Sequence, residues 1–200
     1  MAKKRVLLVP SPAGPPLVQD GIYVGCDQSI SGTGLVAVDT DGQYISHRLV
    51  KGGEASAPMQ ALERIINIFQ DMYQWINSLK DDKVPCVVLE DFAFSQANQM
   101  ALLGGLGYHI RVMLRQTGWN FSACPTGTLK KIVVGKGNAN KSAMILGVYK
   151  RWAFETEDDN IADAFGLAKI AWMAYAKPIP GSLGTRQSDF APLDKLKVYR

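Results

Sequence analysis

The sequence lacks the features that mark membrane, secreted and zinc-dependent proteins. None of its apolar runs reaches eighteen residues, so we expect no transmembrane helix. The basic start, MAKKR, precedes an apolar run of only four residues, which is too short for the hydrophobic part of a secretory signal. The two histidines, His47 and His109, lie far apart, and the three cysteines show no metal-ligand spacing. We therefore expect a cytoplasmic protein whose thiols (Cys26, Cys86 and Cys124) stay reduced.

Acidic residues are absent from one long central segment. Positions 92–154 contain no Asp or Glu but eight cations, and this imbalance favours a polyanionic partner such as DNA over a plain solvated surface. The chain as a whole is 47% hydrophobic and 20% charged, which excludes a fully disordered protein. The eight cations are Arg111, Arg115, Lys130, Lys131, Lys136, Lys141, Lys150 and Arg151.

The hydrophobic patterns predict one α/β domain with two extensions. Residues 1–20 are Pro-rich and form an arm with a possible short strand at 6–9, residues 21–176 form the domain, and residues 177–200 form a tail or packing arm. Apolar runs and alternation predict strands over 21–27, 32–39, 43–50, 84–89 and 120–124. Helical spacing predicts helices over 57–79, 96–117, after Pro125, over 141–152 and over 158–175. A three-stranded meander followed by strand, helix and strand is the element order of a ribonuclease H-like fold, with a mixed five-stranded sheet flanked by helices.

Acidic residues follow two of these strands and begin the last helix. Asp27 and Glu90 each end an apolar run, while Asp159 and Asp163 are four residues apart and so share one helical face. Clustered carboxylates repel one another without a cation, and their oxygens suit Mg²⁺ or Mn²⁺. Two ions about 3.5–4 Å apart would activate a water molecule and stabilise the leaving oxygen of a phosphodiester.

Each of these acids also has an interpretation without catalysis. Asp27 could cap the turn that follows it, and Glu90 could be a solvated strand end or a helix N-terminal acid. Asp159 has the position of a helix N-cap. Asp163 lies among apolar residues, where an unpaired carboxylate is costly, so its alternative is a buried ion pair. The joint placement of the four acids, more than any one of them, indicates a metal site.

The sequence resembles the RuvC-type Holliday junction resolvases, and most closely their bacteriophage members. The resemblance spans most of residues 22–175 in the family's order. It rests on GCDQSISGTGLVAVD (25–39), VVLEDFAF (87–94), LLGGLGYHIRVML (102–114), PTGTLKKIVVGKGNANKSAM (125–144) and DDNIADAFGLAKIAW (158–172). It implies a dimeric, magnesium-dependent endonuclease, in which Asp27, Glu90 and Asp163 take the places of the catalytic acids.

One position departs from the family pattern. The family often has an acid or a histidine three residues before the last aspartate, where this chain has Asn160, so the fourth metal ligand stays open between Asp159 and Asn160. Lys130 and Lys141 match the two family lysines that are linked to DNA binding and to catalysis near the scissile phosphate. The alternative for Lys141 is an ordinary exposed helix lysine.

Further residues are candidates for DNA contact. Phe92 or Phe94 falls where relatives place an aromatic wedge, although core packing is the commoner use of such residues. The loop Gly135–Gly137 could bring backbone amides to a phosphate, and a plain turn is the alternative. The basic segment adds Lys131, Lys136, Arg111 and Arg115 to these candidates.

These observations favour a structure-selective DNA endonuclease that cleaves four-way junctions or other branched DNA. Three alternatives remain: a flap or RNA–DNA hybrid nuclease on the same fold, a non-catalytic branched-DNA-binding protein, and a phosphotransferase of the sugar-kinase type. The departure at Asn160 motivates the non-catalytic alternative. The chain of 200 residues lacks room for the two lobes of a sugar kinase.

Overall fold

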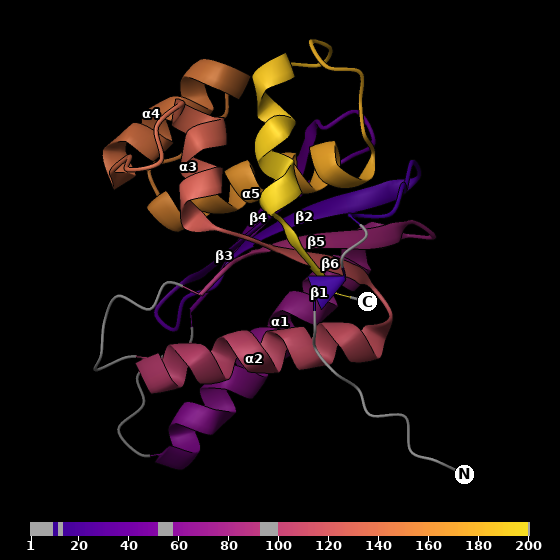
Figure 1. Ribbon diagram of the computed structural model, residues 1–200. Coiled ribbons are helices and arrows are strands. Elements are labelled where there is room, and N and C mark those ends of the chain that lie inside the picture. Colours follow the sequence, from indigo (N-terminus) through magenta and orange to yellow (C-terminus); the bar gives the residue numbers. More distant parts are fainter. Residues whose placement is uncertain (1–9, 12–13, 52–57, 93–99, 200) are drawn as a thin grey trace.

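The computed structural model describes residues 10–11, 14–51, 58–92 and 100–199. A seven-stranded sheet separates two layers of helices (Figure 1). The strands are β1 (Pro10–Ser11), β2 (Gly21–Asp27), β3 (Thr33–Val38), β4 (Tyr44–Val50), β5 (Val84–Glu90), β6 (Asn120–Cys124) and β7 (Lys197–Tyr199). The α-helices are α1 (Pro58–Lys80), α2 (Met100–Thr117), α3 (Thr126–Val134), α4 (Lys141–Trp152) and α5 (Asp159–Tyr175), and two short 3₁₀ helices, η1 (Gln187–Asp189) and η2 (Ala191–Lys195), precede β7.

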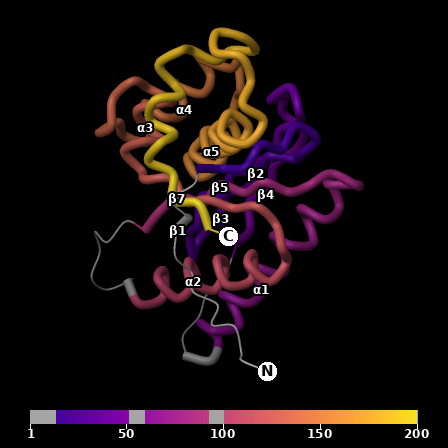
Figure 2. Tube along the Cα trace, turned by 45° about the vertical axis from the view of Figure 1, so that its right-hand side comes forward, coloured from indigo at the N-terminus to yellow at the C-terminus, as the bar shows by residue number. Residues whose placement is uncertain are grey.

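The sheet is mixed, with strand order β1-β7-β6-β5-β2-β3-β4. Strands β2, β3 and β4 form the expected antiparallel meander, and β5 and β6 follow parallel to β2. This arrangement confirms the predicted α/β ribonuclease H-like class. The expected five strands form one contiguous part of the sheet, from β6 to the edge strand β4. The count is corrected to seven because β7 pairs with β6, and β1 with β7. These two short strands come from the segments that we expected to be an arm and a tail (Figure 2).

The core has two halves, one on each side of the sheet. Helices α1 and α2 cover one face, and α3, α4 and α5 cover the other (Figure 1). Alternate residues of a strand point to opposite faces, so Ile22 and Val24 pack with the α1–α2 layer while Tyr23 packs with the α5 layer. Strands β2, β3, β5 and β6 are therefore buried on both faces, as their near-continuous apolar sequences predict, while the edge strand β4 is largely exposed.

Helix α5 packs very closely on the middle of the sheet. A Cβ atom at Gly25 of β2 would lie 1.9 Å from the carbonyl oxygen of Ala164, and one at Gly34 of β3 would lie 2.3 Å from the carbonyl oxygen of Asn160. Only glycine leaves room for the helix backbone at these two positions. The first turns of α5 therefore lie over the ends of β2 and β3 where Asp27 is located.

Several predicted element boundaries fall outside the described residues or differ slightly from those in the structure. The possible strand at 6–9 and the expected start of a helix at residue 96 lie outside the described residues. Helix α5 begins at Asp159, and the residue before it, Asp158, is the N-cap. Among the described helices, none has both the length and the apolar character that crossing a lipid bilayer requires.

The packing of α5 gives a stability prediction. Gly25→Ala should destabilise the protein by about 3 kcal/mol or more, because the added methyl group meets helix backbone that cannot move aside. The melting temperature should fall by roughly 6–12 °C in thermal unfolding followed by circular dichroism. The matched control is Gly104→Ala in α2, where a Cβ meets nothing within 4 Å. It should stabilise the helix by about 0.5–1 kcal/mol, and equal effects of the two substitutions would contradict the packing argument.

Candidate metal centre

The parallel pairing of β2 and β5 brings the first two acids together. Cys26 is paired with Leu89 in the register, so the next residues, Asp27 and Glu90, stand side by side where both strands end. Their carboxyl groups share a hydrogen bond. The side chain of Asp27 is buried. Burial and this contact both raise the pKa of Asp27, because they oppose its charged form.

Helix α5 adds the acids on its first turns. The Asp158 carboxylate caps the helix by accepting hydrogen bonds from the backbone N–H groups of Asn160 and Ile161. The N-cap interpretation of Asp159 is therefore wrong, because Asp159 is the first helical residue. Its carboxylate forms an ion pair with Lys141.

Electrostatic contacts show that the four acids act on one another. Burial raises the pKa of Asp27 well above its ordinary value, and the charges of Glu90, Asp163 and Asp159 raise it further. Burial also raises the pKa of Asp163 to about 7, with repulsion from Glu90 as the next cause and Lys130 opposing both. The acids at 27, 90, 159 and 163 thus form one cluster, which we call the carboxyl cluster. Asn160 lies beside this group, with its side-chain amide close to Gly32.

Neighbouring side chains hold Glu90 in place. The hydroxyl of Thr126, at the start of α3, donates a hydrogen bond to Glu90 Oε1 at 2.6 Å. The side-chain amide of Gln28 donates to the Glu90 carbonyl oxygen at 2.9 Å. Sequence reasoning missed both residues. Their only signal is position. Gln28 directly follows the end of β2, and Thr126 follows Pro125, the residue after β6, so both lie at the same end of the parallel strands as Glu90.

Arg111 has a structural position and does not reach a DNA-binding surface. It is 1% exposed on α2, and its guanidinium donates to Gln28 Oε1, to the Gly107 carbonyl and to the Glu90 carbonyl. It also lies 3.6 Å from the Asp91 carboxylate. The expectation that Arg111 contacts DNA is therefore wrong, because the protein's own groups surround its charge.

Two of the predicted lysines lie at the carboxyl cluster. Lys141, the first residue of α4, has an 80% exposed side chain that is paired with Asp159, and the hydrogen bond to Asp159 raises the Lys141 pKa. Lys130 of α3 is half-buried and close enough to Asp163 to oppose the rise of its pKa. Both ammonium groups thus lie beside acids of the carboxyl cluster.

The other predicted DNA contacts lie in different places. Lys131 and Lys136 are exposed on α3 and the loop after it. Arg115 is exposed in the last turn of α2. This turn leads to the start of β6, whereas the acids lie where the parallel strands end, so Arg115 is at the opposite end of the strands. Phe92 packs on α2, with its ring 4.1 Å from the Arg111 guanidinium and 4.9 Å from the Tyr108 ring. Phe94 lies outside the described residues.

The carboxyl cluster fits a hard divalent cation. Asp163 Oδ1 is buried and accepts no hydrogen bond within the described part of the chain, so a strong acceptor there has its coordination capacity free. Among the described residues, no three His, Cys, Asp or Glu side chains already stand at metal-coordinating distances. The acids meet instead in pairs. Turning the carboxyls toward a common point would give an all-oxygen site of the type that Mg²⁺ prefers.

The chain has a ribonuclease H-like fold with a candidate metal centre at the strand ends. The chain superposes on Thermus thermophilus RuvC with a TM-score of 0.61 and 21% identity, over 76% of this chain and 95% of that one. For T. thermophilus RuvC in complex with a Holliday junction substrate the TM-score is 0.64 at 19% identity, over 89% and 99%. A yeast mitochondrial Holliday junction resolvase gives a TM-score of 0.46 at 12% identity, over 81% of each chain.

Comparison of the sequence with protein-family models and with curated proteins found no match. The structural likeness to RuvC, at 19–21% identity, establishes the fold. The resemblance to bacteriophage members stays a prediction.

The raised pKa of Asp163 predicts how stability depends on pH. The group titrates near 3.8 when solvated and near 7 in the fold, so between these values the folded state binds the extra proton. The free energy of unfolding of the metal-free protein should therefore fall as the pH rises through this range, by at most about 1.4 kcal/mol per pH unit for one proton. Urea unfolding in the presence of a chelator measures this slope.

Asp163→Asn should make that profile less steep, since the asparagine carries no titrating proton and only the contribution of Asp27, whose pKa is also raised, remains. Asp194→Asn, at an exposed position of η2, is the matched control and should retain the wild-type slope. Added Mg²⁺ should also flatten the wild-type profile, because a cation replaces the bound protons. A wild-type slope in Asp163→Asn would show that this carboxyl is not the group that resists ionisation.

Proposed function

We propose that the chain is a metal-dependent, structure-selective DNA endonuclease that hydrolyses phosphodiesters in Holliday junctions or other branched DNA. The convergence of Asp27, Glu90 and Asp163 at one edge of the sheet carries the proposal. These acids come from three elements that are far apart in the sequence. Asp27 is buried and Glu90 and Asp163 are half-buried, so charge is costly there. A structural role alone would not gather like charges at a site that lacks a full set of cationic partners.

Divalent ions bound by Asp27, Glu90, Asp163 and Asp159 would supply an activated water and would stabilise the leaving oxygen. The protein's own groups do the rest. Thr126 holds the orientation of Glu90 through the hydroxyl bond to Oε1. Asp159, rather than Asn160, is assigned as the fourth ligand, because its charge acts on both Asp27 and Asp163.

The lysines beside the carboxyl cluster would bind the phosphate to be cut. Lys141 carries an exposed ammonium group next to the acids and would release Asp159 to a metal ion while turning toward the phosphoryl oxygens. Lys130, Lys131 and Lys136 extend the positive surface along α3 and its following loop. Phosphate contacts of this kind position DNA without reading its sequence, so branched shape would determine the substrate.

The solved complex of T. thermophilus RuvC with a Holliday junction substrate, whose fold this chain shares, supports branched DNA as the substrate. A four-way junction has two equivalent strands to cut, so we also propose a homodimer that presents one carboxyl cluster to each strand.

The first test of this function is cleavage of a synthetic four-way junction. The wild-type protein should cut it in Mg²⁺ or Mn²⁺ and not in a chelator. Asp27→Asn, Glu90→Gln and Asp163→Asn should each reduce the rate by about a hundredfold or more, because each removes a direct ligand oxygen. Asp194→Asn is the control and should cut at the wild-type rate.

Parallel cleavage assays with a flap, a linear duplex and an RNA–DNA hybrid determine which nucleic-acid substrate the protein prefers. Faster cleavage of the flap or the hybrid than of the junction would assign one of those substrates in place of branched four-way DNA. Tight junction binding with no cleavage in any metal would instead assign a non-catalytic binding protein.

Lys141 should affect chemistry more than binding. Lys141→Ala should slow junction cleavage by about 10²–10³-fold, because it removes a cation that faces the developing negative charge. Junction affinity, measured by gel shift in Ca²⁺, should change much less, since many other phosphate contacts remain. Lys80→Ala, at the end of α1 on the opposite face of the sheet, is the control. An equal loss of affinity and rate would make Lys141 a binding residue only.

A further inference from the structure

A second cavity lies between α3, α4 and the C-terminal segment, and no residue of the carboxyl cluster lines it. Its volume is about 620 Å³, within the range of ligand pockets. We call it the α3–α4 pocket. One side is aliphatic and the other is cationic. The lining residues are Val133, Val134, Ala143, Leu146, Gly147, Lys150, Arg151, Gly184, Thr185 and Arg186.

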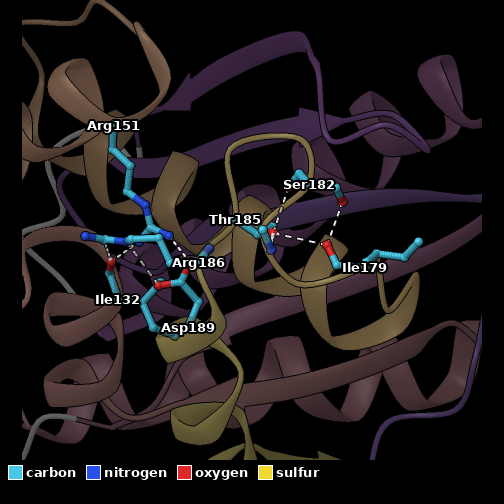
Figure 3. A network of polar contacts seen from close by, with 8 residues as sticks. Ile132, Arg151, Ile179, Ser182, Thr185, Arg186 and Asp189 are labelled. Carbon is cyan, nitrogen blue, oxygen red and sulfur yellow. Dashed lines mark hydrogen bonds and ion pairs between the residues drawn. The ribbon is translucent and has the colours of Figure 1, made fainter.

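The cationic side carries more positive charge than its acid can balance. Arg151 and Arg186 both donate to the Ile132 carbonyl oxygen and both pair with the Asp189 carboxylate (Figure 3). Asp189 is buried between them, so one carboxylate serves two guanidinium groups. Lys150, exposed in the last turn of α4, adds a third cation. This side of the pocket therefore has an excess of two positive charges.

Arg186 has hydrogen-bonding capacity that the protein leaves accessible. Its side chain is 55% exposed although it contacts Asp189 and Ile132. Arg151 is only 7% exposed, so it contributes its positive charge rather than accessible donors. An anion that entered the pocket could accept hydrogen bonds from the Arg186 guanidinium. Asp189 already holds this group in place, so little side-chain entropy would be lost on binding.

The aliphatic side shows that the anion must carry apolar groups. Val133 and Val134 of α3 face α4 at Gly147, and Leu146 beside them is 48% exposed. A DNA backbone has only the C–H groups of its sugars to cover this surface, whereas a peptide can place a whole aliphatic or aromatic side chain there and carboxylates on the cations. Burial of such a side chain together with paired charge is the pattern of peptide-binding pockets.

We propose that the α3–α4 pocket binds a short acidic segment of a partner protein. An apolar side chain of that segment lies on Val133, Val134 and Leu146, and its carboxylates pair with Lys150 and Arg186. The site is separate from the carboxyl cluster, so peptide binding needs neither metal nor DNA. The proposal goes beyond the nuclease function and does not depend on it.

The test is fluorescence polarisation of a labelled peptide of alternating Glu and Leu residues, with the full chain in chelator and without DNA. Lys150→Glu should weaken binding by about tenfold, because it replaces attraction by repulsion at the pocket rim. Leu146→Ser should weaken it by about fivefold through lost apolar contact. Lys195→Glu, at an exposed position outside the pocket, should bind as the wild type does. Neither Lys150 nor Leu146 holds the Arg151–Asp189 pair, so both variants should fold.

Two peptide controls separate charge from apolar contact. A Gln/Leu peptide and a Glu/Ser peptide should both bind more weakly than the Glu/Leu peptide. Equal binding of all three, or wild-type affinity in Lys150→Glu, would overturn the proposal. So would a result in which Lys150→Glu weakens junction binding and leaves peptide binding unchanged, since the pocket would then be a DNA contact. Failure of junction cleavage with peptide binding intact would overturn the nuclease function alone.

Discussion

The contact between α5 and the two strands beneath it determines the geometry of the candidate site. Gly25 and Gly34 let the helix backbone approach the strands to a distance that any side chain would prevent. Because α5 is almost wholly buried along its length, it cannot shift to relieve a conflict at its first turns. Its first acids are therefore held beside the ends of β2 and β5, and Asp163 faces Glu90 and Asp27 whether or not this is electrostatically favourable.

That arrangement opposes folding, and the rest of the structure compensates for it. Buried carboxyls that repel one another take up protons, as the raised pKa values of Asp27 and Asp163 indicate. The two apolar layers on either face of the sheet supply the stability that this cluster lacks. The rigid fold fixes the backbone positions of these acids, so a cation would have to turn only their side chains and would not have to move the backbone.

The fold and the acids could be predicted because both leave local signals. Alternating and helical apolar spacing predicts strands β2 to β6 and the helices, and an acid at the end of a buried strand marks Asp27 and Glu90. Asp163 was found because a carboxylate among apolar helix residues is unusual. The sequence could not show that Asp158, rather than Asp159, is the helix N-cap. The two residues are identical aspartates in consecutive positions, and only the backbone geometry distinguishes them.

What could not be predicted depends on contacts between distant segments. In the sequence, Arg111 and Lys130 are equivalent cations of one basic segment. In the structure, Arg111 is buried against Gln28 and the Glu90 carbonyl, while Lys130 lies near the acids. Strand β7 has three residues and no apolar pattern long enough to detect, and it forms because β6 offers an unpaired edge. Lys197 of β7 then pairs with Asp91 at 2.5 Å, the same carboxylate that faces Arg111. The C-terminal segment thus helps to neutralise the residue next to Glu90, so the end of the chain contributes to the electrostatics of a site whose acids all come from elements before it.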